Sequence, residues 1–180
     1  MTPSSGASRI LVLDGHPDAT SVRAGFAAAA AEAAQARCAE VRLLHLSAMV
    51  FDPNVAGGYK TRQEIEPYLV AFQESLRWCD MLILVHPIWW GAAPAKLKGL
   101  IDRVFLPGIA FAQEGDGHFS KKMFEGRTAR VLITMDTPGW YVWLGRRNGW
   151  LNVLRHQFLD FVGLKVTHMK TVGPVRDATP

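Results

Sequence analysis

The sequence predicts an α/β fold, a doubly wound five-stranded parallel sheet enclosed by helices in a three-layer sandwich. Five short apolar runs have the pattern of strands, and segments with helical character separate them. Parallel neighbours need long crossovers, so this alternation favours one open sheet, with strand order 2-1-3-4-5. The first strand is followed by DGHPDATSVR rather than by a G-x-G-x-x-G turn, which disfavours the competing dinucleotide-binding topology.

The first half of the chain supplies two strands and two helices. Residues 9–13 (RILVL) form the first expected strand, and the alanine-rich residues 21–37 form a helix of high intrinsic propensity. Residues 41–45 form the second strand. The segment SAMVFDPNVAGGYKTR then contains Asp-Pro-Asn and Gly-Gly, which favour a long irregular excursion before a helix over residues 61–78.

The second half begins with the most informative strand. Residues 81–86 (MLILVH) have the continuous apolar character of a central strand, which Pro87 ends, and residues 94–104 follow as a helix with proline in its first turn. Residues 105–126 are rich in glycine and charge and are expected to be irregular. The remaining expected elements are a strand over residues 128–135, a helix capped by Asn148 and running to residue 161, and a strand over residues 164–171.

Length and composition indicate a soluble globular protein, and we expect one domain over residues 1–180. No apolar run reaches the roughly 20 residues that a membrane span needs, and the first residues lack a secretory signal, so we expect a cytoplasmic protein without membrane insertion. Cys38 and Cys79 fit no metal or redox spacing, and no metal is expected.

The net charge of +4 favours anionic ligands such as nucleotide phosphates. The basic residues are scattered, with short pairs only, and no helix carries the continuous basic stripe of a protein that reads duplex nucleic acid. We therefore expect no nucleic-acid partner.

The segment after the first strand is a candidate anion site. Thr20 and Ser21 can offer hydroxyls to a phosphate, and the helix that begins here can offer free backbone N–H groups. His16 and Arg23 could add positive charge. The alternative is an ordinary helix cap, because threonine and serine are common at that position.

Two further segments should lie at the same carboxyl edge of the sheet. The loop PIWWG, residues 87–91, combines small residues that allow close backbone approach with two indoles that supply an apolar wall. Residues 136–141 (DTPGWY) leave the fourth strand through turn-forming residues. Together the three segments suggest a site for a flat aromatic ligand such as a flavin. The alternative is that the tryptophans are core or dimer contacts.

The chain resembles the NAD(P)H:quinone oxidoreductase family of flavodoxin-like flavoproteins, which includes bacterial drug-activity modulators and ancillary subunits of potassium efflux systems. The resemblance covers nearly the whole chain. It rests on GHPDATSVR, SAMVFDP, the long segment HPIWWGAAPAKLKGLIDRVFLPGIAF and the turn after the fourth strand. It implies a flavodoxin-like sheet and a flavin, with FMN preferred because the chain is short and FAD as the alternative.

The resemblance also implies which residues bind the flavin, and all three segments contribute. They are His16, Thr20, Ser21, Val22 and Arg23 at the phosphate, Pro87, Ile88, Trp89, Trp90 and Gly91 along the ring, and Thr137, Pro138 and Gly139 at its pyrimidine end. The last three depart from the Thr-Thr-Gly-Gly turn common in the family.

Catalytic candidates follow that turn. The family places a tyrosine and a histidine near the flavin edge where negative charge develops on reduction, and Tyr141 and Arg147 stand nearest to those positions here. A cation such as Arg147 could stabilise the reduced flavin anion.

The implied activity is transfer of two electrons from NAD(P)H to a quinone or a similar flat acceptor, in a ping-pong sequence because both substrates share one pocket. Trp89, Trp90, Trp140 and Trp143 would form an apolar slot for the acceptor; alternatively the last two cap the core or face a partner. The alternative function is that of an ancillary regulatory subunit of a potassium efflux transporter. A single-electron carrier is disfavoured, because such carriers are usually acidic.

A homodimer is expected from the resemblance. Only nine residues follow Thr171, too few for the last helix of a flavodoxin-like sheet, so a second subunit is expected to cover one face of the fifth strand.

Overall fold

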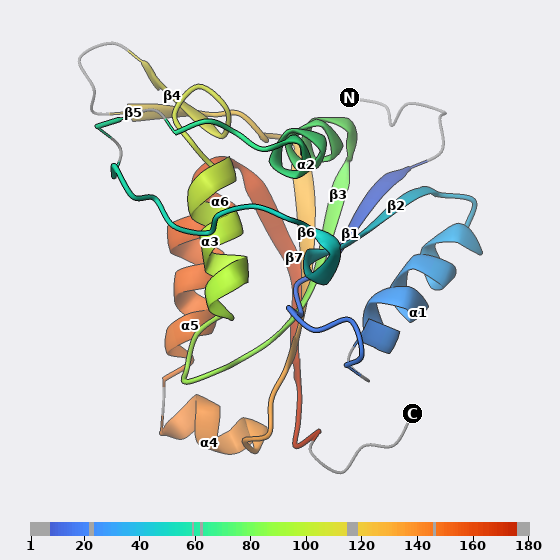
Figure 1. The fold of residues 1–180 in the computed structure, drawn as a ribbon. Coiled ribbons are helices and arrows are strands. Elements are labelled where there is room, and N and C mark those ends of the chain that lie inside the picture. The colour runs from blue at the N-terminus through green and yellow to red at the C-terminus, as the bar shows by residue number, and fades with distance from the viewer. Residues whose placement is uncertain are drawn as a thin grey trace.

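The computed structural model describes residues 8–21, 24–58, 60–61, 63–114, 119–145 and 147–175. Its main sheet is parallel and runs in the order β2-β1-β3-β6-β7, which confirms the predicted order 2-1-3-4-5. The five strands are β1 (Arg9–Asp14), β2 (Glu40–His45), β3 (Met81–Pro87), β6 (Arg127–Thr134) and β7 (Leu164–Val172). Figure 1 shows the carboxyl ends of the central strands converging toward the lower part of the molecule.

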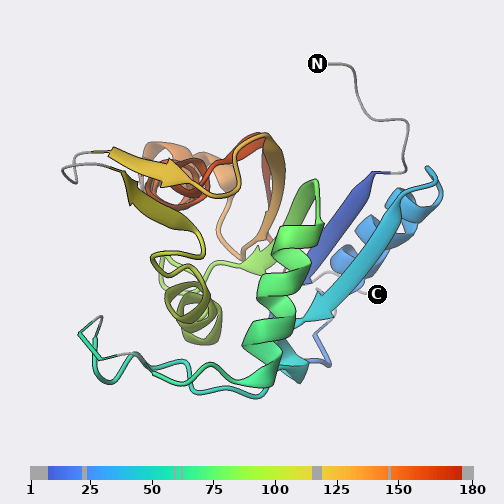
Figure 2. The same cartoon turned by 90° about the horizontal axis from the view of Figure 1, so that it is seen from above.

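Helices cover both faces of the sheet, which confirms the three-layer arrangement (Figures 1 and 2). One face packs on a single helix, α1 (Ala24–Gln35). The other packs on α2 (Pro67–Trp78), α3 (Ala95–Val104) and a helical run made of α5 (Gly149–Asn152), the π-helical segment η2 (Val153–Leu159) and α6 (Asp160–Val162).

The apolar side chains of the strands explain these layers. In β1, Val12 faces α1 while Leu11 and Leu13 face the larger core with α2 and α3. Side chains of a strand alternate between the two sides of its sheet, and a central parallel strand is buried on both sides. The continuous apolar runs of β1 and β3 follow from that position.

Three expectations about the elements were wrong in part. Residues 105–126 are not wholly irregular, because β4 (Phe111–Glu114) and β5 (Phe119–Lys122) form an antiparallel hairpin. A short helix, α4 (Gly139–Leu144), lies within and beyond the segment expected to be a turn. The helix expected from residue 61 begins at Pro67, where proline occupies the first turn.

Asn148 precedes α5 as predicted, but it does not cap that helix with its side chain. Its backbone is left-handed, with φ of 53°, and its side chain makes no capping hydrogen bond. Asparagine tolerates this conformation better than most residues. The residue therefore sets the direction in which the chain enters α5.

The long excursion before α2, with the short 3₁₀ turn η1 (Leu46–Ala48) at its start, is held against α3 by a buried arginine. Arg103 is 3% exposed and forms an ion pair with Glu66, with 2.7 Å between Nη2 and Oε2. Its guanidinium also donates to the carbonyl oxygens of Asp52, at 2.6 Å, and Glu64, at 2.5 Å. Such a multiply bonded guanidinium fixes the path of the excursion.

The side of β7 that shares a face with α1 is basic. In register, Arg130 of β6 lies beside His168, and Leu132 lies beside Lys170. Arg130, Lys165, His168 and Lys170 are all exposed. Two copies that met through this face would bring like charges together, which disfavours the expectation that a second subunit covers it.

Within the described ranges, no helix is long and apolar enough to cross a membrane.

Candidate functional site

The three predicted segments meet at the carboxyl edge of the sheet, because β1, β3 and β6 are neighbours. Gly15, after β1, donates its backbone N–H to the carbonyl of Val85 in β3, at 2.7 Å. Ile88, after β3, donates to the carbonyl of Thr134 in β6, at 2.9 Å. Each loop is thus tied to the adjacent strand at the point where it begins.

The first loop is built around a buried carboxylate. Asp14 is 1% exposed, and its side chain accepts a hydrogen bond from the backbone N–H of His16 at 3.1 Å. Its second oxygen lies 3.1 Å from Nδ1 of His45, at the end of β2. His16 is itself buried, and its Nδ1 accepts from the backbone N–H of Asp18 at 3.1 Å. These bonds fix the first turn of the loop.

A second carboxylate in this loop engages the donors predicted to hold a phosphate. One oxygen of Asp18 accepts from both the backbone N–H and the hydroxyl of Thr20, each at 2.9 Å. These two hydrogen bonds lower the pKa of Asp18. Ser21 follows Thr20, whereas Val22 and Arg23 lie outside the described residues. The donors of Thr20 therefore already converge on one anionic oxygen.

The second loop is a two-residue turn with a tryptophan at its tip. Trp89 and Ala92 exchange both backbone hydrogen bonds, at 2.9 and 3.1 Å. Between them Trp90 and Gly91 both have positive φ, 51° and 82°, as in a type I′ turn. Glycine suits this conformation, but tryptophan does not. The turn projects Trp90 outward, and its side chain is fully exposed.

The first and second loops are in contact. The indole of Trp89 meets the imidazole of His16 edge to face, with 5.7 Å between ring centroids. Ile88 is half-buried and Pro87 is buried in β3. The structure therefore brings together residues predicted to bind the phosphate end and the ring end of one ligand.

The third loop continues directly into α4. Thr137 is half-buried. Pro138 directly precedes the helix, and its carbonyl oxygen accepts a hydrogen bond from the backbone N–H of Tyr141 at 3.0 Å. A Cβ added to Gly139 would find only the Thr171 hydroxyl within 4 Å, at 3.8 Å. Packing therefore does not require glycine at that position.

A cavity of about 560 Å³ joins the second loop, the third loop and the start of α5. Volumes of this order are typical of small-molecule sites. Four predicted residues line it: Ile88, Trp90, Gly91 and Thr137. Six others were not predicted: Met135, Val142, Gly149, Trp150, Leu151 and Val153.

Except for Met135, which directly follows β6, the missed residues belong to helices, where the apolar positions look the same whether they face a core or a cavity. The pattern of residues 148–161 predicts a helix, yet periodicity alone does not tell which turn lies over the loop after β3. Asn148, with its left-handed backbone, directs the first turn of α5 there. Trp150 was a sign in the sequence, as a further large aromatic side chain close to the predicted segments.

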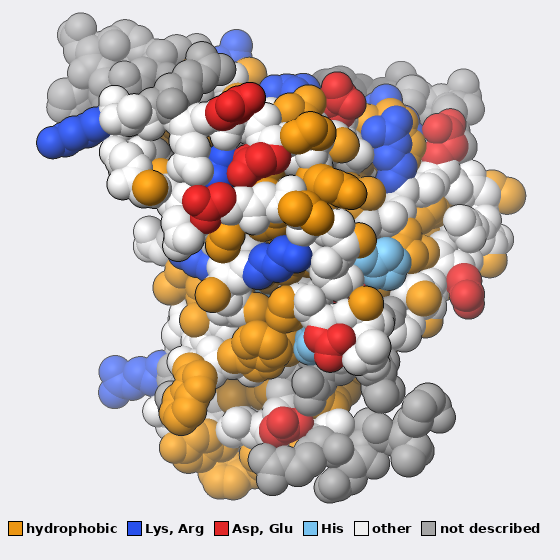
Figure 3. Space-filling model, viewed as in Figure 1, with side chains coloured by type: hydrophobic (Ala, Val, Ile, Leu, Met, Phe, Trp, Pro, Cys, Tyr) orange, Lys and Arg blue, Asp and Glu red, His pale blue; other side chains and the backbone are white. Residues whose placement is uncertain are grey.

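The predicted catalytic residues do not line this cavity. Tyr141 lies in α4, half exposed, with its ring edge to face against Trp140 at 5.9 Å between centroids. Arg147 is exposed, with φ of 47°. Trp140 and Trp143 are about two-thirds exposed, at 65% and 64%, and lie outside the cavity lining. Figure 3 shows hydrophobic side chains gathered over α4, at the lower end of the molecule.

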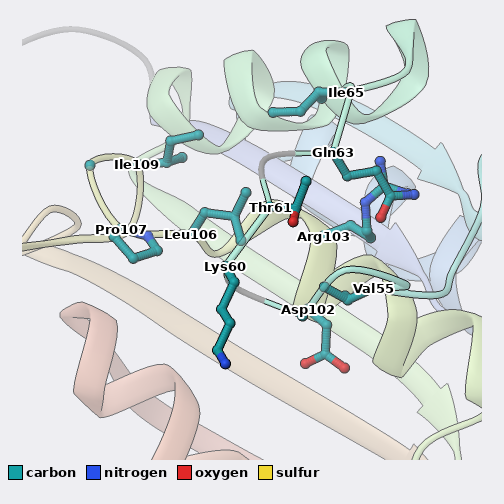
Figure 4. A pocket seen from close by; sticks show the side chains of 12 residues that line it. Val55, Lys60, Thr61, Gln63, Ile65, Asp102, Arg103, Leu106, Pro107 and Ile109 are labelled. Carbon is teal, nitrogen blue, oxygen red and sulfur yellow. The ribbon is translucent and has the colours of Figure 1, made fainter.

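A second cavity, of about 520 Å³, lies at the opposite end of α3 from the second loop. Lys60, Thr61 and Gln63 of the excursion and Asp102 and Arg103 of α3 are among the residues that line it (Figure 4). Of the predicted ligand-binding residues that the structure describes, none lines this cavity. The part of the chain that the structure describes also contains no group of three or more His, Cys, Asp or Glu side chains placed to hold a metal ion.

The residues at the sheet edge fit a flavin. The walls of the larger cavity are mostly apolar, from Ile88, Val142, Trp150 and Val153, and Thr137 supplies a hydroxyl. Apolar walls with a few polar groups are what a flat heteroaromatic ring requires. The donors of Thr20 show that the first loop can satisfy an anionic oxygen.

Comparison with known proteins shows the family to which the chain belongs. The family model described as "Flavodoxin-like fold" matches residues 8–180. NAD(P)H dehydrogenase [quinone] 1 of Cavia porcellus is 30% identical over 146 residues, which are 70% of this chain and 52% of the relative. The chain therefore spans about half the length of that relative.

Two solved structures share the fold. The NAD(P)H:quinone oxidoreductase from Methanothermobacter marburgensis is 22% identical, with a TM-score of 0.78 over 97% of this chain and 90% of that one. An FMN-dependent NADH-azoreductase from Bacillus anthracis, in complex with FMN, is 16% identical, with a TM-score of 0.69 over 91% and 86% of the two chains. From the family match, this chain belongs to the family of flavodoxin-like fold proteins in which the NAD(P)H:quinone oxidoreductases are found.

Proposed function

We propose that the protein is a flavin-dependent oxidoreductase that transfers two electrons from NAD(P)H to a quinone or a similar flat acceptor. The observation that carries this proposal is the apolar cavity of about 560 Å³ at the carboxyl edge of the sheet, beside a loop whose donors converge on an anionic oxygen. The names of the relatives support the same substrate classes.

In this proposal the chain supplies position and polarity around the ring. Ile88, Trp150 and Val153 form apolar walls, and Thr137 offers a hydroxyl to a polar ring edge. A bound flavin supplies the hydride-accepting chemistry, which no side chain here can provide. Because one cavity serves both substrates, NAD(P)H leaves before the acceptor enters, and the kinetics are ping-pong.

We assign the phosphate of the cofactor to the loop after β1. His16, Thr20 and Ser21 are its described members. Asp18 now holds the amide and the hydroxyl of Thr20, so a phosphate that uses these donors must displace the Asp18 carboxylate. FMN is the expected cofactor and FAD the alternative; the FMN named for the Bacillus anthracis azoreductase supports the first.

Tyr141 and Arg147 keep their proposed roles at the edge of the ring. Both follow Thr137 on the segment that rims the cavity, and the positive charge of Arg147 suits a site where negative charge develops. Nothing in the described part of the chain favours a transporter subunit over an enzyme.

The experiment combines cofactor identification with steady-state kinetics. We expect the purified protein to show flavin absorbance, to release FMN on heating as identified by mass, and to oxidise NAD(P)H with benzoquinone in a parallel-line kinetic pattern. A Val153→Trp substitution should fill the cavity and weaken FMN binding at least tenfold. Val70→Trp, at a similarly exposed apolar position in α2, is the matched control and should bind normally.

The proposal is wrong if the protein is colourless and takes up neither FMN nor FAD when either is added in excess. Intersecting rather than parallel kinetic lines would contradict the ping-pong order alone.

A further inference from the structure

His86 is a buried polar residue at the junction of the candidate site. It lies in β3 directly before Pro87, and it is 1% exposed. Its Nδ1 lies 2.9 Å from the carbonyl oxygen of Pro87. Burial lowers the pKa of His86 to about 4, so the ring is neutral near pH 7. From this geometry we assign the proton to Nδ1, which donates to Pro87.

The other ring nitrogen has no hydrogen-bond partner among the described residues. Nε2 of His86 is fully buried, and so is the indole nitrogen of Trp150, which is likewise unpaired. The two rings meet edge to face at 6.2 Å between centroids. A Cβ added to Gly15 would lie 3.0 Å from the Cβ of His86. The imidazole therefore lies among the first loop, the second loop and the first turn of α5.

Stability alone does not explain a histidine here. A phenylalanine would keep an aromatic ring beside Trp150, without an unpaired buried nitrogen. Polar groups that are only partly satisfied in a core point to a role other than packing. Among the described residues, the hydrogen bond to the Pro87 carbonyl is the one that the imidazole makes.

We propose that His86 is a positioning residue, whose Nδ1–H bond to the Pro87 carbonyl orients the peptide where the aromatic loop begins. Through that peptide it sets the backbone of residues 88–91 against the flavin ring. The ligand named here rests on the proposed function, whereas the ordering of the loop does not.

Two substitutions separate the hydrogen bond from the packing. His86→Phe keeps a ring beside Trp150 but loses the donor, whereas His86→Asn keeps an N–H close to the position of Nδ1 but loses most of the ring. For His86→Phe we expect a melting temperature equal to or above that of the wild type and FMN binding about tenfold weaker, the usual order for one lost hydrogen bond. For His86→Asn we expect a lower melting temperature with FMN affinity within about twofold of the wild type, because the donor is retained.

Amide hydrogen exchange of the protein without cofactor gives a second readout. The amides of Ile88 and Ala92, which bond to Thr134 and Trp89, should exchange faster in His86→Phe and normally in His86→Asn. Gln73→Leu is the matched control: it removes a buried side-chain hydrogen bond to the Val104 carbonyl in α3, away from the loop. It should change neither loop exchange nor FMN affinity.

FMN affinity and amide hydrogen exchange can contradict the proposal independently of each other. If FMN affinity follows the order of melting temperatures, or if His86→Phe exchanges like the wild type, His86 does not position the loop. If the wild type binds no flavin at all, the proposed function is wrong, and the exchange experiment still decides the role of His86.

Discussion

Two carboxylates and one imidazole determine how the sheet edge can hold a ligand. Asp14 is buried, and its carboxylate is hydrogen-bonded to the backbone N–H of His16 and contacts Nδ1 of His45, so it fixes the conformation of the first loop. Asp18 is exposed and bonded to Thr20. The first is part of the scaffold. The second already accepts both hydrogen bonds of Thr20, so a phosphate bound there, as we propose, would have to compete with a side chain of this chain.

The buried imidazole makes stability depend on pH. The pKa of His86 is lowered from 6.5 to about 4 by burial, so between these values the unfolded chain binds a proton that the folded protein excludes. The stabilisation is complete above about pH 6.5 and is lost as the pH falls toward 4, by on the order of 3 kcal/mol in total.

His86→Phe should therefore lose less stability than the wild type on acidification. Urea unfolding at several values between about pH 7 and 4.5 would give the free energies of unfolding, and the difference between the two proteins should widen in favour of the variant as the pH falls. Carboxylates with lowered pKa, such as Glu66 and Asp80, titrate in both proteins and cancel in the comparison. If the free energies of unfolding of the two proteins fall in parallel as the pH is lowered, His86 is not the group that makes stability depend on pH.

At the scale of elements, the sequence predicts the parallel sheet well and the elements outside it poorly. The runs around Leu11 and Leu84 are continuous because both faces of β1 and β3 are covered, and such runs are recognisable. The hairpin β4–β5 was missed because its strands are four residues long and contain polar residues. Helix α4 was missed because tryptophan, tyrosine and valine are weak helix formers and Pro138-Gly139 has the composition of a turn.

The candidate site divides in the same way. Loops that follow adjacent parallel strands must share an edge, so the grouping of the loops around Thr20, Trp90 and Thr137 is predictable from strand order. Contacts between elements are not: the position of Trp150 over the cavity depends on the backbone of Asn148, and the bond between Asp18 and Thr20 depends on the turn that the loop adopts.

The type I′ turn leads to a prediction about stability and function together. Trp90 has a left-handed backbone, which costs about 1 to 2 kcal/mol for most L-residues and less for asparagine. Asn-Gly is the preferred pair for this turn, so Trp90→Asn should raise the free energy of unfolding, by about 0.5 to 1 kcal/mol. Because Trp90 lines the cavity, the same change should weaken the use of flat acceptors.

Trp143→Asn is the control for Trp90→Asn. Trp143 is also highly exposed, but it lies in α4 with a helical backbone, so asparagine relieves no strain there. Thermal and urea unfolding of both variants would measure the difference. A Trp90→Asn protein less stable than the wild type would mean that the indole makes stabilising contacts that outweigh the backbone strain.

On the scale of the whole molecule, two surfaces of the described residues differ in the chemistry that they offer for self-association. The end of the molecule around α4 is aromatic and apolar, with Trp90, Trp140, Trp143 and Leu144 all more than 60% exposed (Figure 3). The open side of β6 and β7 carries Arg130, Lys165, His168 and Lys170. Exposed apolar patches mark interaction surfaces, whereas like charges oppose pairing. The expected homodimer should therefore use the aromatic end, next to the candidate site.

This assignment of the dimer surface is testable by size-exclusion chromatography with light scattering over a range of concentrations. The wild type should be a dimer, and Trp140→Ser with Trp143→Ser should shift it toward monomer, because the apolar area removed lies at the proposed interface. Lys165→Glu with Lys170→Glu should leave the dimer intact, since these side chains lie on the open side of β7. A dimer that survives the tryptophan substitutions but dissociates on charge reversal would place the interface on the sheet instead. In that case the aromatic end would stay open to solvent, and the acceptor could approach the cavity without passing a second subunit.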